Sequence, residues 1–107
     1  MSEPLSEDEC PPTPQFQGAL SREMQIVNRK GLHARATAKF VQCVDRFDAD
    51  IKVVRCGETV GGDSIMGILT LGAGPGSTIT VFASGAEAKE ALEALAELVS
   101  NRFGEDE

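Results

Sequence analysis

The stretch from residue 28 to residue 40 reads Asn-Arg-Lys-Gly-Leu-His-Ala-Arg-Ala-Thr-Ala-Lys-Phe and predicts a turn that opens into a helix. Gly31 supplies the turn, and from Ala36 onward apolar residues recur at helical spacing. His33, the only histidine of the chain, therefore falls at the start of this helix. Unpaired backbone N–H groups and the positive end of the helix dipole make such a position favourable for a phosphoryl group.

The patterns on either side of this helix predict the element order βαββαβα. Alternation of apolar and polar residues predicts strands over 21–28, 50–55, 58–60 and 77–83. Helical spacing predicts one helix over 33–46 and another that runs from a capping box at 84–87 to about Gly104. With a further short helix, four strands with polar outer faces predict an antiparallel sheet covered on one side by three helices, which is an α+β fold.

The short helix is the ambiguous element. Residues 64–71 read Ser-Ile-Met-Gly-Ile-Leu-Thr-Leu, whose β-branched residues favour a strand, but Ser64 after Asp63 is typical of a helix N-cap. We predict a helix. Its apolar side chains could all fill the core, yet a two-turn helix has more of them than one buried face needs. Some are therefore expected to be exposed and to dock a partner, the candidates being Ile65, Met66 and Leu69.

Composition places the folded part in the middle of the chain. The 107 residues suit one domain. Residues 1–19 hold four of the five prolines and four acidic residues without any Lys or Arg, so we predict a disordered extension there. The folded domain is predicted over 20–104, with an acidic tail at 105–107. The formal charge of −7 lies in these two ends, and we expect no nucleic-acid partner, although the acidity argues only weakly against one.

The cysteines and the hydropathy pattern limit the classes of protein. Cys10, Cys43 and Cys56 form an odd set without a Cys-x-x-Cys pair, so neither a disulfide framework nor a zinc site is indicated. We expect a cytoplasmic protein without metal or cofactor. No run of 18 apolar residues predicts a membrane span, and the acidic N-terminus does not resemble a secretory signal.

The role of His33 has an ordinary alternative, because a lone histidine in a small domain usually has a surface or structural role. Three observations favour chemistry: the helix start, Arg35 two residues on, whose guanidinium could grip a phosphate, and the lack of a second His, Cys or nearby carboxylate to build a triad or metal site. A lone imidazole can attack a phosphoryl donor and form a labile phosphoramidate that is passed on.

Two further motifs allow competing interpretations. Ser64 is either only an N-cap or also a hydroxyl that a kinase modifies, and both can hold together. The loop 72–76, Gly-Ala-Gly-Pro-Gly, is predicted to be a turn and not a phosphate-binding loop, because no Gly-Lys-Ser/Thr follows and Pro75 lacks an amide donor.

Together these residues resemble the HPr family, the histidine-containing phosphocarriers of the bacterial sugar phosphotransferase system. Gly-Leu-His-Ala-Arg at 31–35 is similar to the family's phosphorylation-site motif, and Asp-Ser-Ile-Met-Gly-Ile-Leu at 63–69 is similar to its regulatory-serine motif. The interval of 31 residues between His33 and Ser64 also matches the family. The resemblance covers residues 21–103 and implies an open-faced β-sandwich.

The resemblance implies a phosphorelay component with a covalent phosphohistidine intermediate rather than a stand-alone enzyme. His33 would take phosphate on Nδ1 from phosphorylated enzyme I, which uses phosphoenolpyruvate, and pass it to IIA proteins or domains. Arg35 would steady the phosphate, and an HPr kinase/phosphorylase would act on Ser64. The docking surface would consist of Ile65, Met66 and Leu69. We expect a monomer, since a carrier must keep its active surface free.

Two positions depart from the family pattern, and other functions stay open. Ala36 stands where the family usually has Pro, which restores a backbone N–H near the phosphate. Asp63 would repel a phosphate on Ser64. The first alternative is a regulatory binding module of a nitrogen-type or gene-regulatory branch, in which the phosphorylation state is the signal. The second is a plain interaction domain in which His33 is incidental.

Overall fold

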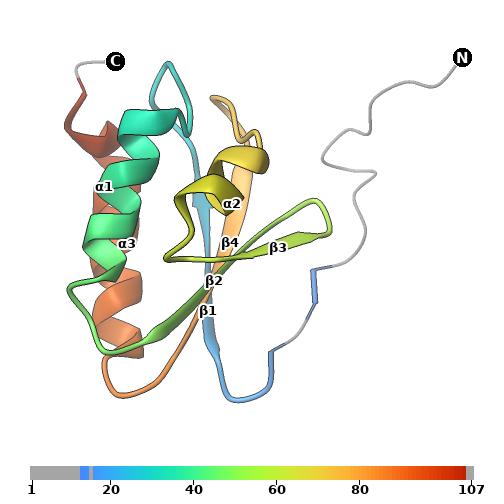
Figure 1. Cartoon of the computed structure of the whole chain (residues 1–107), viewed down its shortest axis with the longest axis vertical. Helices are drawn as coiled ribbons and strands as arrows, with labels where there is room; N and C mark the ends of the chain where they lie inside the picture. The colour runs from blue at the N-terminus through green and yellow to red at the C-terminus, as the bar shows by residue number, and fades with distance from the viewer. Residues whose placement is uncertain (1–12, 15, 106–107) are drawn as a thin grey trace, which may run out of the picture.

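The structure, a computed structural model, describes residues 13, 14 and 16–105. Figure 1 shows a sheet with helices packed against it, in the predicted order βαββαβα. The elements are β1 (Leu20–Gln25), α1 (Ala34–Val44), β2 (Asp50–Arg55), β3 (Glu58–Gly61), α2 (Ile65–Thr70), β4 (Thr78–Ser84), α3 (Ala88–Ser100) and the short 3₁₀ turn η2 (Arg102–Gly104).

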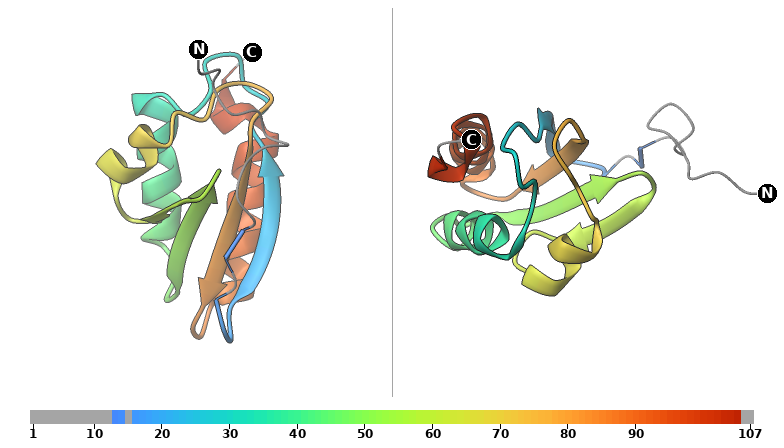
Figure 2. Two further views of the ribbon diagram at one scale, coloured as in Figure 1. Left: turned by 90° about the vertical axis from the view of Figure 1, so that its right-hand side faces the viewer. Right: turned by 90° about the horizontal axis from the view of Figure 1, so that it is seen from above.

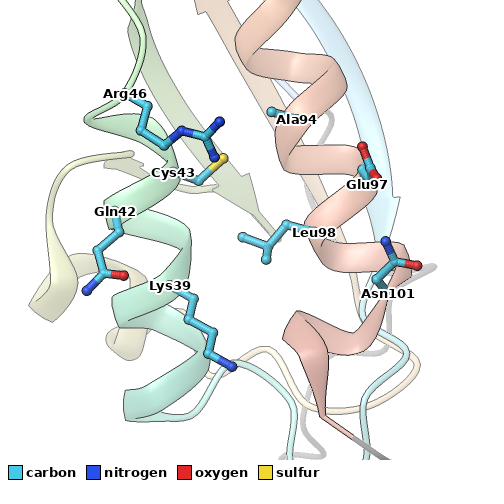
Figure 3. Close-up of a pocket in the computed structure, with 8 residues that line it drawn as sticks. All are labelled: Lys39, Gln42, Cys43, Arg46, Ala94, Glu97, Leu98 and Asn101. Carbon is cyan, nitrogen blue, oxygen red and sulfur yellow. The ribbon is translucent and has the colours of Figure 1, made fainter.

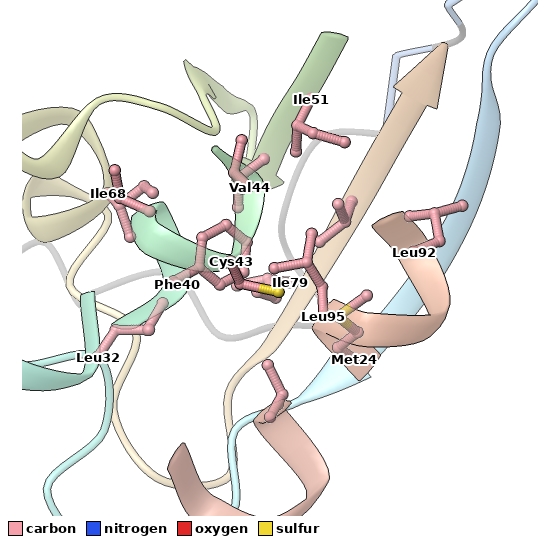
Figure 4. Close-up of a cluster of buried hydrophobic side chains, with 14 of the residues drawn as sticks. Met24, Leu32, Phe40, Cys43, Val44, Ile51, Ile68, Ile79, Leu92 and Leu95 are labelled. Carbon is pink, nitrogen blue, oxygen red and sulfur yellow. The ribbon is translucent and has the colours of Figure 1, made fainter. Parts of the chain in front are cut away.

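The sheet is antiparallel throughout, with the strand order β1-β4-β2-β3. Helix α3 packs on β1 and β4, and α1 lies between α2 and α3, as the two views of Figure 2 also show. The inward-facing strand residues meet the apolar stripes of the helices in one core, part of which Figure 4 shows around Phe40, Ile79 and Leu95. The predicted α+β fold is confirmed.

Strand β1 ends earlier than the predicted range 21–28. Beyond Gln25 the chain bonds to the loop before β4, where Ile26 donates to the carbonyl of Ser77 and accepts from the amide of Gly76. The turn toward α1 then begins at Asn28, whose carbonyl accepts from the amide of Gly31. The predicted alternation therefore continues past the last residue that pairs in the sheet.

The outer face of the sheet is less polar than predicted. Phe82 is only 5% exposed and Val54 only 2%, yet neither belongs to the main core. The ring of Phe16 lies edge-on against Phe82, with 4.7 Å between the ring centroids. Phe16 falls within the segment 1–19 predicted to be disordered, of which residues 1–12 and 15 lie outside the described residues.

Two local predictions are wrong. No capping box opens α3: Ser84 pairs with Asp50 at the end of β4, while Glu87 is the N-cap and its side chain accepts from the backbone N–H of Asp48 at 2.7 Å. The sequence also indicated no disulfide framework, yet Cys56 is disulfide-bonded, whereas Cys43 is free and buried. Burial raises the pKa of the Cys43 thiol and outweighs the opposite effect of Arg46.

Candidate functional site

His33 is the N-cap of α1, where the sequence predicts the helix start. Its backbone is extended (φ −79°, ψ 179°), and its ring Nδ1 accepts from the backbone N–H of Arg35 at 3.3 Å. The imidazole therefore caps the helix, since an N-cap side chain accepts from one of the amides that have no partner within the helix. With 26% of its side chain exposed, the ring is sheltered but open to an incoming group.

The turn before His33 is held against the loop that precedes β4. Gly31 has φ +67°, and a Cβ there would lie 2.6 Å from the carbonyl oxygen of Ala73, so a side chain would require both strain and displacement. The amide of Leu32 donates to that same carbonyl at 2.9 Å. The loop 72–76, which was predicted only to be a turn, therefore supports the turn that precedes His33.

A carboxylate from the other end of the chain contacts the ring. Nε2 of His33 lies 2.6 Å from Oε2 of Glu105, which follows η2 and is 72 residues away in sequence. The side-chain amide of the fully buried Asn28 donates to Oε1 of Glu105 at 3.0 Å and to the carbonyl of Gly31 at 2.8 Å. The expectation that no carboxylate lies near His33 is therefore wrong.

Glu105 is ionised in this setting. Partial burial raises the pKa of its carboxyl, but hydrogen bonds from Asn28 and His33, together with the charges of His33 and Lys30, outweigh burial and hold the pKa below its ordinary value. The segment is anchored because Nζ of Lys39 donates to the carbonyl of Phe103 at 2.6 Å and the Phe103 ring is buried. The contact with Glu105 was not predicted, because 72 residues separate it from His33 and it was assigned to an acidic tail.

Arg35 and Lys30 bring positive charge to this end of the molecule. Both side chains are exposed, Arg35 in the first turn of α1 and Lys30 in the turn before His33. Arg35 also donates its backbone N–H to the His33 ring, so its side chain leaves the backbone close to the imidazole. A phosphoryl group on Nδ1 would meet backbone amides and a flexible cation there.

Ser64 is the N-cap of α2, as predicted. Its Oγ accepts from the backbone N–H of Gly67 at 3.0 Å, and its side chain is half-buried. The neighbouring Asp63 is exposed. The serine is therefore a structural cap, and its hydroxyl hydrogen is not used by this hydrogen bond.

The apolar residues of α2 divide between the core and the surface. Ile68 is fully buried, whereas Ile65 is 44% and Met66 71% exposed. Leu69 is half-buried. Val27, in the chain just before the histidine turn, is also exposed. Since α2 packs against α1, exposed apolar side chains lie on the helix adjoining the one that His33 caps.

An open groove of about 490 Å³ runs between α1 and α3 (Figure 3). Charged, polar and apolar side chains line it, and His33 is not among them. The residues that line it are Lys39, Gln42, Cys43, Arg46, Ala94, Glu97, Leu98 and Asn101. Among the described residues, no group of three or more His, Cys, Asp or Glu could hold a metal ion. Within this same part of the chain, every helix is too short or too polar to cross a membrane.

Comparison with known proteins identifies the class. The family model described as "PTS HPr component phosphorylation site" matches residues 20–101. The phosphocarrier protein HPr of Cupriavidus necator is 47% identical over 88 residues, which cover 82% of this chain and 99% of that protein. The phosphocarrier protein NPr of Shewanella violacea is 40% identical over 86 residues, or 80% of this chain and 94% of that protein.

Solved structures agree with these sequence relatives. HPr-C-His from Thermoanaerobacter tengcongensis superposes with a TM-score of 0.79 at 38% identity, covering 82% of this chain and 99% of that one. HPr from Bacillus anthracis gives a TM-score of 0.74 at 46% identity, with 78% and 99% covered. The chain belongs to the HPr family, the phosphocarriers of the phosphotransferase system. The predicted family is confirmed.

Proposed function

We propose that His33 accepts a phosphoryl group from phosphorylated enzyme I and passes it to IIA proteins or domains. The observation that carries this proposal is the ring geometry: Nδ1 accepts from the Arg35 amide, while Nε2 is occupied by Glu105. Nδ1 is therefore the nitrogen whose lone pair points toward the helix amides. Family membership supports the same role.

In the transfer step, the Arg35 amide releases Nδ1, whose lone pair attacks the phosphorus of the donor, and the bond between phosphorus and the donor breaks with its electron pair left on the donor. The Arg35 amide and the positive helix end stabilise the arriving charge. Ala36, in place of the family's usual Pro, contributes one more N–H in the first turn, where such groups have no acceptor within the helix. The Arg35 guanidinium steadies the phosphate as a charge-assisted donor.

We further propose that Ser64 is a regulatory phosphorylation site and that Ile65, Met66 and Leu69 form the docking surface for enzyme I and IIA proteins. The exposure of Ile65 and Met66 supports the docking role, since flexible apolar side chains suit several partners. A phosphate on Ser64 would place negative charge beside that surface. The protein would act as a monomer in the cytoplasm, where phosphoenolpyruvate is available to phosphorylate enzyme I.

A second candidate is a regulatory module whose phosphorylation state signals to partners without sugar transport. The observation that favours it is the similarity to the NPr of Shewanella violacea. The two candidates share the chemistry of His33 and differ only in the acceptor. Loss of this protein should impair sugar uptake under the carrier proposal and leave it unchanged under the regulatory one.

The chemistry is tested by incubating the full chain with enzyme I and phosphoenolpyruvate. We expect a mass increase that is lost in acid, as for a phosphoramidate, and that is absent from His33→Ala. Ser64→Ala should still gain the phosphoryl group, which separates the two sites. A wild-type chain that remains unmodified would contradict the proposal.

A further inference from the structure

The turn between β1 and α1 meets the C-terminal end of the described residues at the imidazole of His33. Asn28 uses one amide hydrogen on the carbonyl of Gly31 and the other on Oε1 of Glu105, while Oε2 of Glu105 contacts Nε2 of the ring. Both neighbours of the Asn28 amide are acceptors, so its nitrogen must face them and its orientation is fixed. The carboxylate is therefore held at both oxygens, one by the asparagine and one by the histidine.

We propose that Glu105 is a positioning residue for phosphoryl transfer, selecting the ring tautomer in which Nε2 carries the proton and Nδ1 carries the lone pair. This inference rests on the proposed function of His33. An ionised carboxylate only accepts, so its 2.6 Å contact requires a hydrogen on Nε2. The Arg35 amide only donates, so its contact requires a lone pair on Nδ1. The two contacts demand the same tautomer.

The carboxylate also serves the transfer step itself. When Nδ1 bonds to phosphorus the ring becomes cationic, and the proton on Nε2 stays in place within its hydrogen bond to Glu105. The negative charge thus lies on the ring edge away from the arriving phosphoryl group, where it stabilises the cation. In the reverse step the N–P bond breaks, its electron pair returns to Nδ1, and the proton again stays on Nε2.

The backbone around Glu105 holds it in place. Phe103 is buried in the core, and its carbonyl accepts from Nζ of Lys39 in α1 at 2.6 Å. The residue that contacts the ring is therefore tied to the same helix that the ring caps. A mobile tail would lose more conformational freedom on forming this contact than an anchored segment does.

The test compares Glu105→Gln and Glu105→Ala with a control, Glu93→Gln, which removes a carboxylate from the exposed face of α3. In each full-length chain, the ¹⁵N chemical shifts of the His33 ring report the tautomer, and the rate of phosphorylation by enzyme I reports transfer. We expect wild type and Glu93→Gln to show a single Nε2–H tautomer. Both Glu105 variants should show a mixture and a rate roughly tenfold lower, the loss of one charge-assisted hydrogen bond.

The outcomes separate this inference from the proposed function. Glu105 variants that keep the wild-type ring shifts, or that lose the single tautomer yet transfer at the wild-type rate, would overturn the positioning role. Failure of wild type to accept phosphate would instead overturn the function of His33, and this result is read before any variant is compared. Thermal melting of each variant shows that the fold is retained.

Discussion

The two helix starts that carry the family motifs share one local geometry and differ in what surrounds it. At α1 the ring Nδ1 of His33 accepts from a backbone amide at 3.3 Å, and at α2 the Oγ of Ser64 does the same at 3.0 Å. Only at α1 does the capping side chain also contact a carboxylate from the far end of the chain, Glu105. The cap alone therefore does not define the chemistry of either site.

The neighbours of the two caps point to different roles. His33 has the exposed cation Arg35 beside it, and its turn is buttressed by the carbonyl of Ala73. Ser64 has the exposed anion Asp63 before it and the exposed Met66 after it. The first arrangement suits the repeated gain and loss of a phosphoryl group. The second suits a surface on which one added charge alters docking.

Arg35→Ala should produce the largest effect, a slower phosphorylation that has no counterpart at the helix start of α2. Removing one charge-assisted contact to the phosphoryl group costs about 1.5–3 kcal/mol, so phosphorylation by enzyme I should slow by roughly 10- to 150-fold. The matched change at the other helix start, Asp63→Ala, should alter the rate by only about twofold, because exposed charges contribute little. Mass spectrometry of reactions quenched at successive times measures the phosphorylation rates of both variants. Equal rates would remove the distinction between the two helix starts.

Gly31→Ala should break the support of the histidine turn. The residue has φ +67°, and the new Cβ would meet the Ala73 carbonyl at 2.6 Å, so the free energy of unfolding should fall by about 1–3 kcal/mol. Gly74→Ala is the control, since nothing lies within 4 Å of a Cβ at that position. Denaturant melts measure both changes. Similar losses in the two variants would show that the contact of Gly31 with the loop is unimportant.

The order of the elements and the position of His33 could be predicted from the sequence. Alternation and helical spacing predict the element order, because both depend on neighbours along the chain. Gly31 and the spacing after Ala36 place His33 at a helix start for the same reason. The capping box at Ser84 fails because that residue instead pairs with Asp50 in the sheet, and ladder pairing overrides a local preference.

What the sequence could not give is contact between distant segments. Glu105 reads as part of an acidic tail, and only the anchoring of Phe103 in the core brings it to the imidazole. Phe82 reads as an outward residue, and only the chain around Phe16 explains its burial. The support from Ala73 likewise joins two loops far apart in sequence. The predicted placement of His33 and Ser64 at helix starts is therefore confirmed, whereas the contact between His33 and Glu105 was not predicted.

Two Ser64 variants separate the effect of the helix cap on stability from the effect of added charge on phosphorylation. Ser64→Ala removes the acceptor for the Gly67 amide and should cost about 1 kcal/mol in stability, with little effect on phosphorylation at His33. Ser64→Asp keeps a capping oxygen but adds charge beside Ile65 and Met66, so phosphorylation by enzyme I should slow by up to about fivefold. Melting curves and phosphorylation rates measure the two effects independently. An unchanged rate in Ser64→Asp would argue against regulation at this position.

The smallest expected effect is the pH dependence of the contact between Glu105 and His33, which has no counterpart at α2. The pKa of Glu105 is lower in the folded chain than the ordinary glutamate value of about 4.3 that applies when the chain is unfolded, so its ionised form stabilises the fold. That contribution is complete above the unfolded value and is lost as the pH falls through the folded one. The stability of wild type should therefore exceed that of Glu105→Gln at neutral pH, and the difference should shrink below about pH 4. Melting temperatures of both chains between neutral and acidic pH measure this difference. A difference that stays constant would mean that the contact of Glu105 with Asn28 and His33 does not depend on its charge.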